Sequence, residues 1–275
     1  MNLADLLAFL HRIDRRPNKG LSQNFLIDQN IVKKIIRTSE LSASDPVLEI
    51  GPGAGALTSL LLDAGAHVYA IEKDSVLARE LERFQTSDQR LHVFTSDILD
   101  FNLQSIKQKD RKIKVIANLP YHITTPILEK LLDSRDLFSC LTIMIQTEVA
   151  ERILAKPGSK AFSSLALFLQ FHADCTASFK VPASCFYPRP KVDSTVLRLN
   201  LHSPPCVDEK MLFSIIRRAF QQRRKMIASS LRSLYSQDLI QKSLYEASAR
   251  SDARPEELSL DQWITFYEKL SKKSD

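Results

Sequence analysis

The sequence predicts an α/β fold in which a sheet domain is followed by a small all-helical domain. Short apolar runs alternate with helical patterns, three of the six glycines fall in one loop after an early run, and the pair Pro204-Pro205 precedes a purely helical pattern. Strands that alternate with helices form a parallel sheet covered on both faces. We therefore expect a sheet domain at residues 1–204 and a helical domain at residues 205–275.

Two helices are expected before the first strand of the sheet. The first spans about Leu3 to Ile13, and a polar, basic loop follows it to about Ile27. Asp28 is suited to cap the second helix, because its carboxylate can accept hydrogen bonds from the free backbone N–H groups of the first turn. Helical periodicity places three residues on the buried side of this helix, Ile31, Ile35 and Ile36.

Five apolar runs are predicted as strands of the parallel sheet, namely Val47–Ile50, Val68–Ile71, Leu91–Phe94, Lys114–Ala117 and Leu141–Ile145. A further strand is expected at Val192–Leu201, and Ser203-Pro204-Pro205 ends it. After this break the apolar residues recur at helical spacing, as in Met211, Leu212, Ile215, Ile216 and Phe220.

The net charge of +6 and the isoelectric point near 9.1 suit a polyanionic partner, although many basic proteins bind no nucleic acid. Clustering of the charge is more informative than its sum. One acid-free stretch contains Arg217, Arg218, Arg223, Arg224 and Lys225. A second basic stretch near the N-terminus contains Arg12, Arg15, Arg16 and Lys19. We expect these two stretches to be candidate backbone-binding patches.

The cysteines indicate neither a metal site nor a disulfide framework. Cys140, Cys175, Cys185 and Cys206 are scattered, without a C-x-x-C pair or a histidine at zinc-ligand spacing. The N-terminus lacks the basic start and apolar run of a secretory signal. The longest apolar stretch, Leu165 to Phe171, is far shorter than a membrane span. We expect a cytoplasmic protein with reduced thiols, without a metal or a membrane partner.

The glycine-rich loop predicts a nucleoside cofactor. Gly51, Gly53 and Gly55 lie between a predicted strand and a predicted helix, where glycine allows a tight turn and leaves no Cβ between the backbone and a ligand. An ordinary turn does not need three alternating glycines. The dinucleotide fingerprint G-x-G-x-x-G places its third glycine three positions after the second, whereas Gly55 is two positions after Gly53. The spacing therefore argues against an NAD-dependent dehydrogenase.

Two acids follow the next two strands. Glu72 ends a strand 21 residues after Gly51, where a carboxylate can accept hydrogen bonds from both ribose hydroxyls of NAD or of S-adenosylmethionine. Asp97 lies at the same edge of the sheet and could accept a hydrogen bond from an adenine amine. As an isolated residue, Asp97 could equally be a helix N-cap.

The tetrapeptide Asn118-Leu119-Pro120-Tyr121 after the fourth strand discriminates between these cofactors. The lone pair of adenine N6 is delocalised into the ring, so this amine is a poor nucleophile for a sulfonium methyl group. The side-chain oxygen of Asn118 and a backbone carbonyl such as that of Leu119 could accept from its N–H groups and free the lone pair. Pro120 would help to fix that carbonyl, and Tyr121 offers a ring for base stacking. The pattern predicts methyl transfer to adenine N6.

The chain resembles the rRNA adenine N6-dimethyltransferase family, and within it the bacterial small-subunit type. The resemblance covers nearly the whole chain and is carried by Leu21–Asp28, Val47–Thr58, Asn118–Pro126 and Phe186–Ser194. One departure is Ser22, where the family usually has glycine. The resemblance implies a Rossmann-like, class I S-adenosylmethionine-dependent methyltransferase sheet with a C-terminal helical domain for RNA recognition.

The resemblance also implies roles for individual residues. S-adenosylmethionine should be contacted by Asn24, Leu26, Gly51, Gly53, Glu72, Asp97 and Asn118. The catalytic set should be Asn118, Leu119, Pro120, Tyr121 and Phe186, with Phe186 closing on the target adenine from the face opposite Tyr121. The alternative for Phe186 is a core aromatic. The cluster Arg217, Arg218, Arg223, Arg224 and Lys225 should face RNA, the alternative being a solvated helix face.

The expected substrate is a pair of adjacent adenosines in the 3′-terminal hairpin loop of small-subunit (16S) rRNA, each dimethylated within a 30S precursor particle by a monomeric enzyme. A target base must leave its stack to reach the pocket, which is less costly in a hairpin loop than in a duplex. One alternative is the large-subunit rRNA dimethylase of the macrolide-resistance type. Another is a ribosome-assembly factor that acts mainly by binding.

Overall fold

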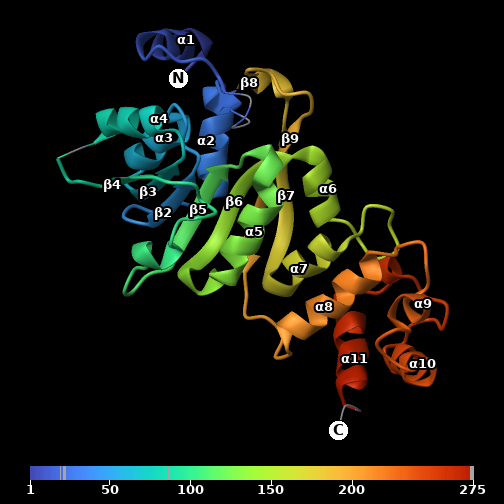
Figure 1. The fold of residues 1–275 in the computed structure, drawn as a ribbon. Coiled ribbons are helices and arrows are strands. Elements are labelled where there is room, and N and C mark those ends of the chain that lie inside the picture. Colours follow the sequence, from blue (N-terminus) through green and yellow to red (C-terminus); the bar gives the residue numbers. More distant parts are fainter. Residues whose placement is uncertain (19, 21–22, 86, 273–275) are drawn as a thin grey trace. The chain divides into compact units, whose positions relative to one another are not determined.

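The computed structural model describes residues 1–18, 20, 23–85 and 87–272. Its described residues form a seven-stranded sheet (Figure 1). The strand order is β4 (Leu91–Thr95), β3 (His67–Glu72), β2 (Pro46–Ile50), β5 (Ile113–Asn118), β6 (Phe138–Gln146), β9 (Ser194–Leu201) and β7 (Ala173–Val181). The five predicted central strands and the predicted late strand are all present.

The strands β2 to β6 pair in parallel, as the alternation of strands and helices predicts. β9 instead runs antiparallel to β6, so the sheet is mixed. β7 lies outside the predicted strands. It ends the strand order, and most of its residues are polar or small and at least partly exposed, so it lacks the apolar run that marks a central strand.

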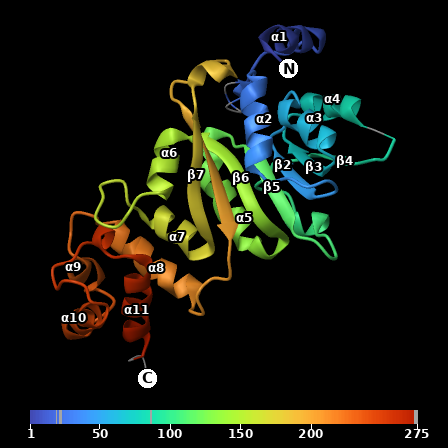
Figure 2. The same ribbon diagram turned by 180° about the vertical axis from the view of Figure 1, so that it is seen from behind.

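Helices cover both faces of the sheet, with α2 (Gln29–Thr38) in front of it in Figure 2 and α5 (Thr124–Asp133) in front of it in Figure 1. Asp28 caps α2 as predicted, since its carboxylate accepts from the backbone N–H groups of Asn30 and Ile31. Ile35 is buried, whereas Ile31 and Ile36 are partly buried and pack against the core. The other helices of this part are α1 (Leu3–Arg12), α3 (Ala56–Asp63) and α4 (Ser75–Glu80), with 3-10 turns at Leu81–Phe84, Leu103–Ile106, Tyr121–Ile123, Arg135–Leu137 and Ala183–Cys185.

A second, two-stranded sheet joins segments that are far apart in the sequence. β1 (Phe25–Leu26) pairs antiparallel with β8 (Phe186–Tyr187), with Phe25 opposite Tyr187 and Leu26 opposite Phe186. The early and late family-like segments therefore lie side by side.

The chain divides into two compact units. The first consists of Met1–Ala150 with Thr176–Leu201, and the second of Glu151–Cys175 with His202–Asp275. The helical domain expected at residues 205–275 thus belongs to a unit that also includes α7 (Ser164–His172) and the end of α6 (Thr147–Ile153). The reason is packing, because Phe162, Leu167 and Phe171 share a core with the C-terminal helices.

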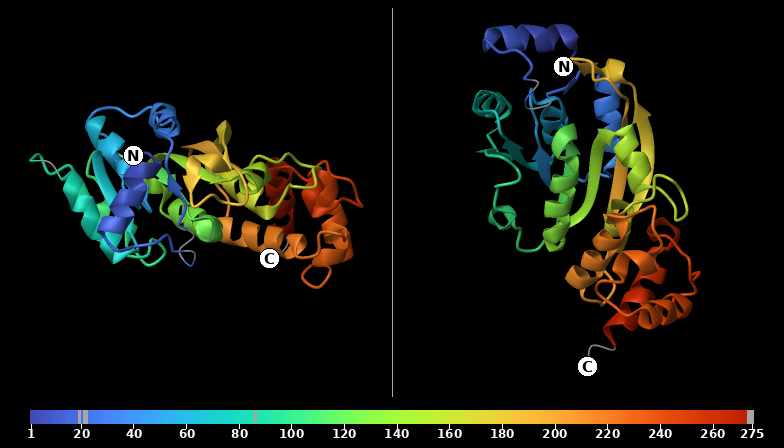
Figure 3. Two further views of the ribbon diagram at one scale, coloured as in Figure 1. Left: turned by 90° about the horizontal axis from the view of Figure 1, so that it is seen from above. Right: turned by 45° about the vertical axis from the view of Figure 1, so that its right-hand side comes forward.

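The second unit is built around aromatic side chains. Its remaining helices are α8 (Glu209–Phe220), α9 (Ile227–Leu231), α10 (Gln237–Glu246) and α11 (Leu260–Ser271), with a 3-10 turn at Pro255–Glu257 (Figure 3). Trp263 is fully buried, its ring lies edge-on to Phe266, and its indole N–H donates to the carbonyl of Pro255. Buried aromatic rings supply much of the apolar area that a small helical unit needs.

No helix among the described residues is long and apolar enough to cross a membrane. The described part of the chain also contains no group of three or more His, Cys, Asp and Glu side chains placed to hold a metal ion.

The loop between β2 and α3 depends on left-handed glycines. Gly51, Gly53 and Gly55 have φ of +65°, +58° and +79°. A Cβ on Gly55 would come within 2.3 Å of the Phe84 ring, whereas a Cβ on Gly51 would meet only the Pro120 ring, at 4.0 Å. Both positions exclude an unstrained side chain, and only Gly55 also lacks the space for one.

We predict that Gly55→Ala destabilises the free protein clearly more than Gly51→Ala. Both changes carry the left-handed strain of about 1–2 kcal/mol, and Gly55→Ala adds overpacking of about 1–3 kcal/mol against Phe84. Urea unfolding monitored by circular dichroism measures the difference. Equal losses in the two variants would show that Phe84 moves aside without cost.

Candidate active site

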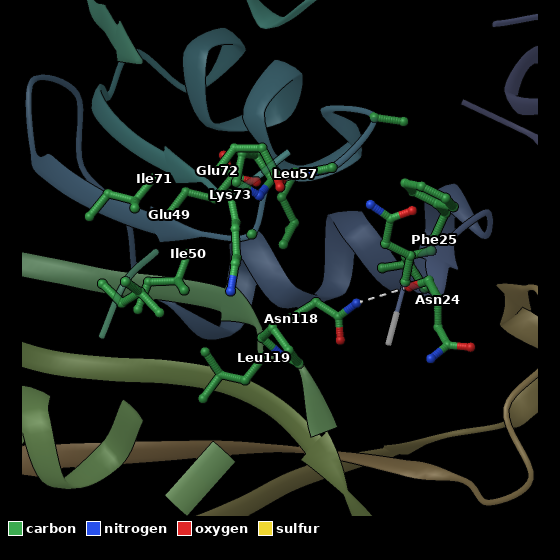
Figure 4. Close-up of a pocket in the computed structure, with 18 of the residues that line it drawn as sticks. Asn24, Phe25, Glu49, Ile50, Leu57, Ile71, Glu72, Lys73, Asn118 and Leu119 are labelled. Carbon is green, nitrogen blue, oxygen red and sulfur yellow. Dashed lines mark hydrogen bonds between the residues drawn. The ribbon is translucent and has the colours of Figure 1, made fainter. Parts of the chain in front are cut away.

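The main cavity opens at the carboxyl edge of the parallel strands (Figure 4). Its wall is formed by the ends of β2, β3, β4 and β5 and by the segment before β1. The predicted cofactor residues that line it are Asn24, Leu26, Gly51, Gly53, Glu72, Asp97 and Asn118. Residues separated by almost a hundred positions are thus brought into one concave site.

Glu72 connects the glycine loop to the start of α4. One carboxylate oxygen accepts from the backbone N–H of Gly53 at 2.9 Å, and the other accepts from that of Asp74 at 2.9 Å. Burial raises the pKa of Glu72, although these N–H groups act in the opposite direction. The carboxylate is therefore held in one orientation at the cavity wall.

Asp97 makes the cap-like bond and also lines the cavity. Its Oδ1 accepts from the backbone N–H of Leu99 at 2.9 Å, and its Oδ2 accepts from Lys73 Nζ at 2.8 Å. The Lys73 ammonium, together with the Leu99 N–H, holds the pKa of Asp97 below its usual value. The carboxylate at this end of the cavity is thus fixed and ionised.

Asn118 presents an oxygen that no group among the described residues satisfies. Its Nδ2 donates to the carbonyl of Asn24 at 3.3 Å, and its Oδ1 is buried without a hydrogen-bond partner. Because a carbonyl can only accept, this contact fixes which end of the amide is nitrogen. Figure 4 shows the bond from Asn118 toward Asn24, with the amide oxygen left free. Asn118 therefore offers a buried acceptor at the cavity.

The rest of the tetrapeptide forms the turn after β5. The backbone N–H of Leu119 donates to the Met144 carbonyl of β6, and the carbonyl of Pro120 accepts from Ile123 and from the Thr124 hydroxyl. The Tyr121 hydroxyl bonds Ser194 Oγ at 2.8 Å, and burial raises its pKa. Leu119, Pro120 and Tyr121 all line the main cavity. The tyrosine ring is therefore anchored at its far end.

Phe186 is not among the residues that line this cavity. Its ring is 2% exposed and belongs to the core cluster that contains Leu26 and Val32. The structure thus places Phe186 in β8, opposite Leu26 of β1 and in the core, and its predicted contact with a target base stays a prediction. Ser22, the departure from the family pattern, lies outside the described residues.

Glu49 lines the main cavity and is not among the predicted site residues. Its side chain is buried, Thr58 Oγ1 donates to its Oε2 at 2.7 Å, and its Oε1 has no hydrogen-bond partner among the described residues. Burial raises its pKa to about 8, and the nearby Glu72 carboxylate adds to the effect. Glu49 is therefore largely protonated at neutral pH. The one sequence feature that could have pointed to Glu49 is the presence of an acid inside the apolar run Val47–Ile50.

The basic side chains of the two stretches differ in their exposure and in their partners. In the second unit, Arg217 and Arg218 lie exposed at the end of α8, and Arg224 and Lys225 lie exposed in the following turn. Arg223 is partly buried and donates to the carbonyls of Lys160 and Phe162, so it holds a loop. In the first unit, Arg12 forms an ion pair with Glu80, while Lys19 lies outside the described residues.

A family model described as "Ribosomal RNA adenine dimethylase" matches residues 15–272. The chain belongs to the ribosomal RNA adenine dimethylase family. This membership confirms the predicted resemblance, and the seven-stranded sheet flanked by helices confirms the predicted class I methyltransferase fold.

The names of individual relatives agree with this family assignment. The chain is 50% identical over 272 residues to ribosomal RNA small subunit methyltransferase A of Protochlamydia amoebophila, covering 97% of this chain and 96% of the relative. It is 43% identical to the protein of the same name from Chlamydia felis, with 100% of both chains covered.

Two solved structures share the fold of this dimethylase. A dimethyladenosine transferase from Plasmodium falciparum has a TM-score of 0.79 and 26% identity, covering 90% of this chain and 98% of that chain. The 23S rRNA methyltransferase ErmE has a TM-score of 0.70 and 26% identity, covering 90% of this chain and 100% of that chain.

We predict that Glu49→Gln flattens the pH dependence of stability. The folded pKa of Glu49 is about 8 against an ordinary value of 4.5. Between these two pKa values the folded state keeps a proton on Glu49 that the unfolded state has lost. The contribution of the protonated Glu49 carboxyl to the free energy of unfolding is therefore fully present below the ordinary pKa, and it is lost as the pH rises toward the folded pKa. The parent should lose roughly 1 kcal/mol per pH unit across this window from Glu49 alone.

Urea unfolding of the free protein at about pH 5.5, 6.5 and 7.5 measures this slope. The exposed Glu82 provides the control, because Glu82→Gln changes the same functional group without removing a buried acid. Parallel losses of stability in the parent and in Glu49→Gln would contradict the prediction.

Proposed function

We propose that this chain transfers methyl groups from S-adenosylmethionine to N6 of adenosines in small-subunit rRNA, giving N6,N6-dimethyladenosine. The observation that carries the proposal is the buried, unpartnered Oδ1 of Asn118, next to Tyr121 at the wall of the main cavity. An unsatisfied buried acceptor costs about 1–3 kcal/mol in the free protein. It is explained if a ligand N–H completes the hydrogen bond.

The residues of the main cavity fit the cofactor. The left-handed glycines leave the loop without side chains where a nucleoside would approach, and Glu72 is positioned to accept from ribose hydroxyls. Asp97 is ionised, as an acceptor for an adenine amine should be. We propose that these residues and Asn24 and Leu26 hold S-adenosylmethionine, which supplies an electrophilic methyl group when bound.

The chain's own contribution to the reaction is positioning and electrostatics. Asn118 Oδ1 would accept a hydrogen bond from the N6 amino group of the target adenine and so favour the tetrahedral geometry in which the nitrogen lone pair is available. The Asn24 carbonyl and the β6 hydrogen bond of Leu119 fix the acceptors before the base arrives. Such pre-organisation lowers the barrier without any covalent intermediate with the protein.

Tyr121 is suited to hold the base. Because its hydroxyl is engaged with Ser194, the ring cannot rotate away from the cavity wall without breaking that hydrogen bond. Stacking on an aromatic ring is worth about 1–3 kcal/mol per base. A flipped base would gain this stacking energy in place of the stacking that it loses in the RNA.

We further propose that the targets are two adjacent adenosines in the 3′-terminal hairpin loop of 16S rRNA, presented by a 30S precursor in the cytoplasm to a monomeric enzyme. The relatives at 43–50% identity are named small subunit methyltransferases, whereas ErmE, named a 23S rRNA methyltransferase, is 26% identical. This difference favours the small-subunit reaction over the large-subunit one. The exposed cations of the second unit, Arg217, Arg218, Arg224 and Lys225, are the proposed RNA contacts there.

We predict that Asn118→Ala abolishes dimethylation while Asn30→Ala does not. Removing one positioned acceptor costs about 10²–10³ in kcat, and Asn30 provides the matched control because it is an exposed asparagine on α2. The measurement is transfer of labelled methyl from S-adenosylmethionine to undermethylated small subunits, followed by nucleoside analysis. A parent protein that bound the particle but formed no methylated adenosine would replace this proposal with a binding role in ribosome assembly.

We predict that Tyr121→Phe keeps most of the activity and that Tyr121→Ala loses it. The hydroxyl bonds Ser194, so its removal leaves the stacking surface in place. Loss of the ring should lower kcat/KM for RNA roughly 5- to 150-fold, equivalent to about 1–3 kcal/mol of stacking. Steady-state kinetics with varied RNA concentration separate the two variants. Equal losses would mean that the hydroxyl, and not the ring, has the main role.

A further inference from the structure

A second cavity adjoins the main one. Four residues line both cavities: Gln23, Asn24, Tyr121 and His122. The second cavity is completed by the loop after β8, with Arg189 and Lys191 in its wall. A nucleotide whose base rests on Tyr121 would therefore have this second cavity directly beside it.

The wall of the second cavity carries positive charge without compensation. Among the described residues, its lining includes Arg189 and Lys191 and no Asp or Glu. Both cations are exposed, and neither forms an ion pair or a hydrogen bond within the described part of the chain. Some other cations are paired with an acid, as Arg12 is with Glu80 and Arg198 with Glu40. Two uncompensated cations in a concave wall attract an anion.

The loop that carries these cations is anchored at both ends. Upstream, β8 pairs with β1. Downstream, Asp193 accepts from the backbone N–H of Ala183 through Oδ1 at 2.9 Å and from that of Thr147 through its carbonyl at 3.0 Å. Ser194 follows and bonds the Tyr121 hydroxyl. The position of Arg189 and Lys191 is thus tied to the position of the ring that would hold the base.

We propose that Arg189 and Lys191 bind the phosphate groups that flank the target adenosine, so that the second cavity holds the RNA backbone while the main cavity holds the base. This inference rests on the proposed function, and it adds a phosphodiester site in the first unit to the RNA contacts proposed in the second. Arginine suits a bidentate contact with a phosphate, and lysine acts as a point charge. Contacts of this kind set the register of the strand.

The test compares Arg189→Ala/Lys191→Ala with Lys191→Arg and with Lys112→Ala. Lys112 is an exposed lysine just before the amino end of β5, so it lies at the edge of the sheet opposite the site. The probe is a fluorescent RNA hairpin with two adjacent adenosines in its loop, and binding is measured over a series of salt concentrations. A second hairpin carries neutral methylphosphonates in place of the phosphates on either side of the target adenosine. Affinity for S-adenosylmethionine is measured for each variant.

In the double variant we expect the hairpin Kd to rise about tenfold, and the slope of log Kd against log salt to fall by about 1.4, the value for two single-strand phosphates. Affinity for S-adenosylmethionine should not change. The methylphosphonate hairpin should bind the parent weakly and should abolish the difference between the parent and the double variant. Lys191→Arg should retain most of the affinity, and Lys112→Ala all of it.

Two results would overturn the inference. One is an unchanged Kd and salt slope in the double variant, and the other is a loss of S-adenosylmethionine affinity together with RNA affinity, which would indicate a structural role for the loop. The binding readout does not depend on methyl transfer. If the parent bound the hairpin through these phosphates but methylated no adenosine, the proposed function would fail while the phosphate site stood.

Discussion

The site depends on one property of parallel sheets: neighbouring strands end at the same edge. β3, β2 and β5 are adjacent in the sheet, so Glu72, the glycine loop and Asn118 are delivered to one place by backbone pairing alone. β2 has β3 on one side and β5 on the other, which makes its end the point where the chain changes direction across the sheet. Ligands of open α/β sheets bind at such points.

Each of the three predicted polar side chains at this edge is held by at least one backbone group. Glu72 is fixed by two N–H groups, Asp97 by Lys73 and an N–H group, and Asn118 by the Asn24 carbonyl. Two buried oxygens of the cavity wall have no hydrogen-bond partner in the described part of the chain, Glu49 Oε1 and Asn118 Oδ1. The free protein thus gives up stability where a bound molecule would supply the missing hydrogen bonds.

The sequence predicts most of this arrangement because the information is local. Each of β2 to β6 coincides with a predicted apolar run, and Gly51, Glu72 and Asn118 lie at or just after the ends of such runs, so their position at the carboxyl edge of the sheet could be predicted without coordinates. The β1–β8 pair could not, since two strands of two residues carry no periodicity and lie about 160 positions apart. The packing of α7 against the C-terminal helices could not be predicted for a similar reason. An apolar helix face indicates burial without naming its partner.

Chemical character was harder to predict than position. In the sequence Glu49 looks like an ordinary strand residue, and only its burial and its single hydrogen-bond partner, Thr58, show otherwise. Phe186 has a motif that suggests contact with a base, yet its ring lies in the core. Burial is set by the whole packed unit, so neither sequence pattern shows it, and the contact of Phe186 with a base stays a prediction.

The wall shared by the two cavities has a thermodynamic consequence. Gln23, Asn24, Tyr121 and His122 face both spaces, and Asn24 also holds the Asn118 amide. A ligand in one space that alters the preferred position of these residues changes the affinity of the other space, and linkage requires the effect to be reciprocal by the same factor. Under that condition the two cavities form a coupled pair, in which the order of occupation affects the path but not the total free energy of binding.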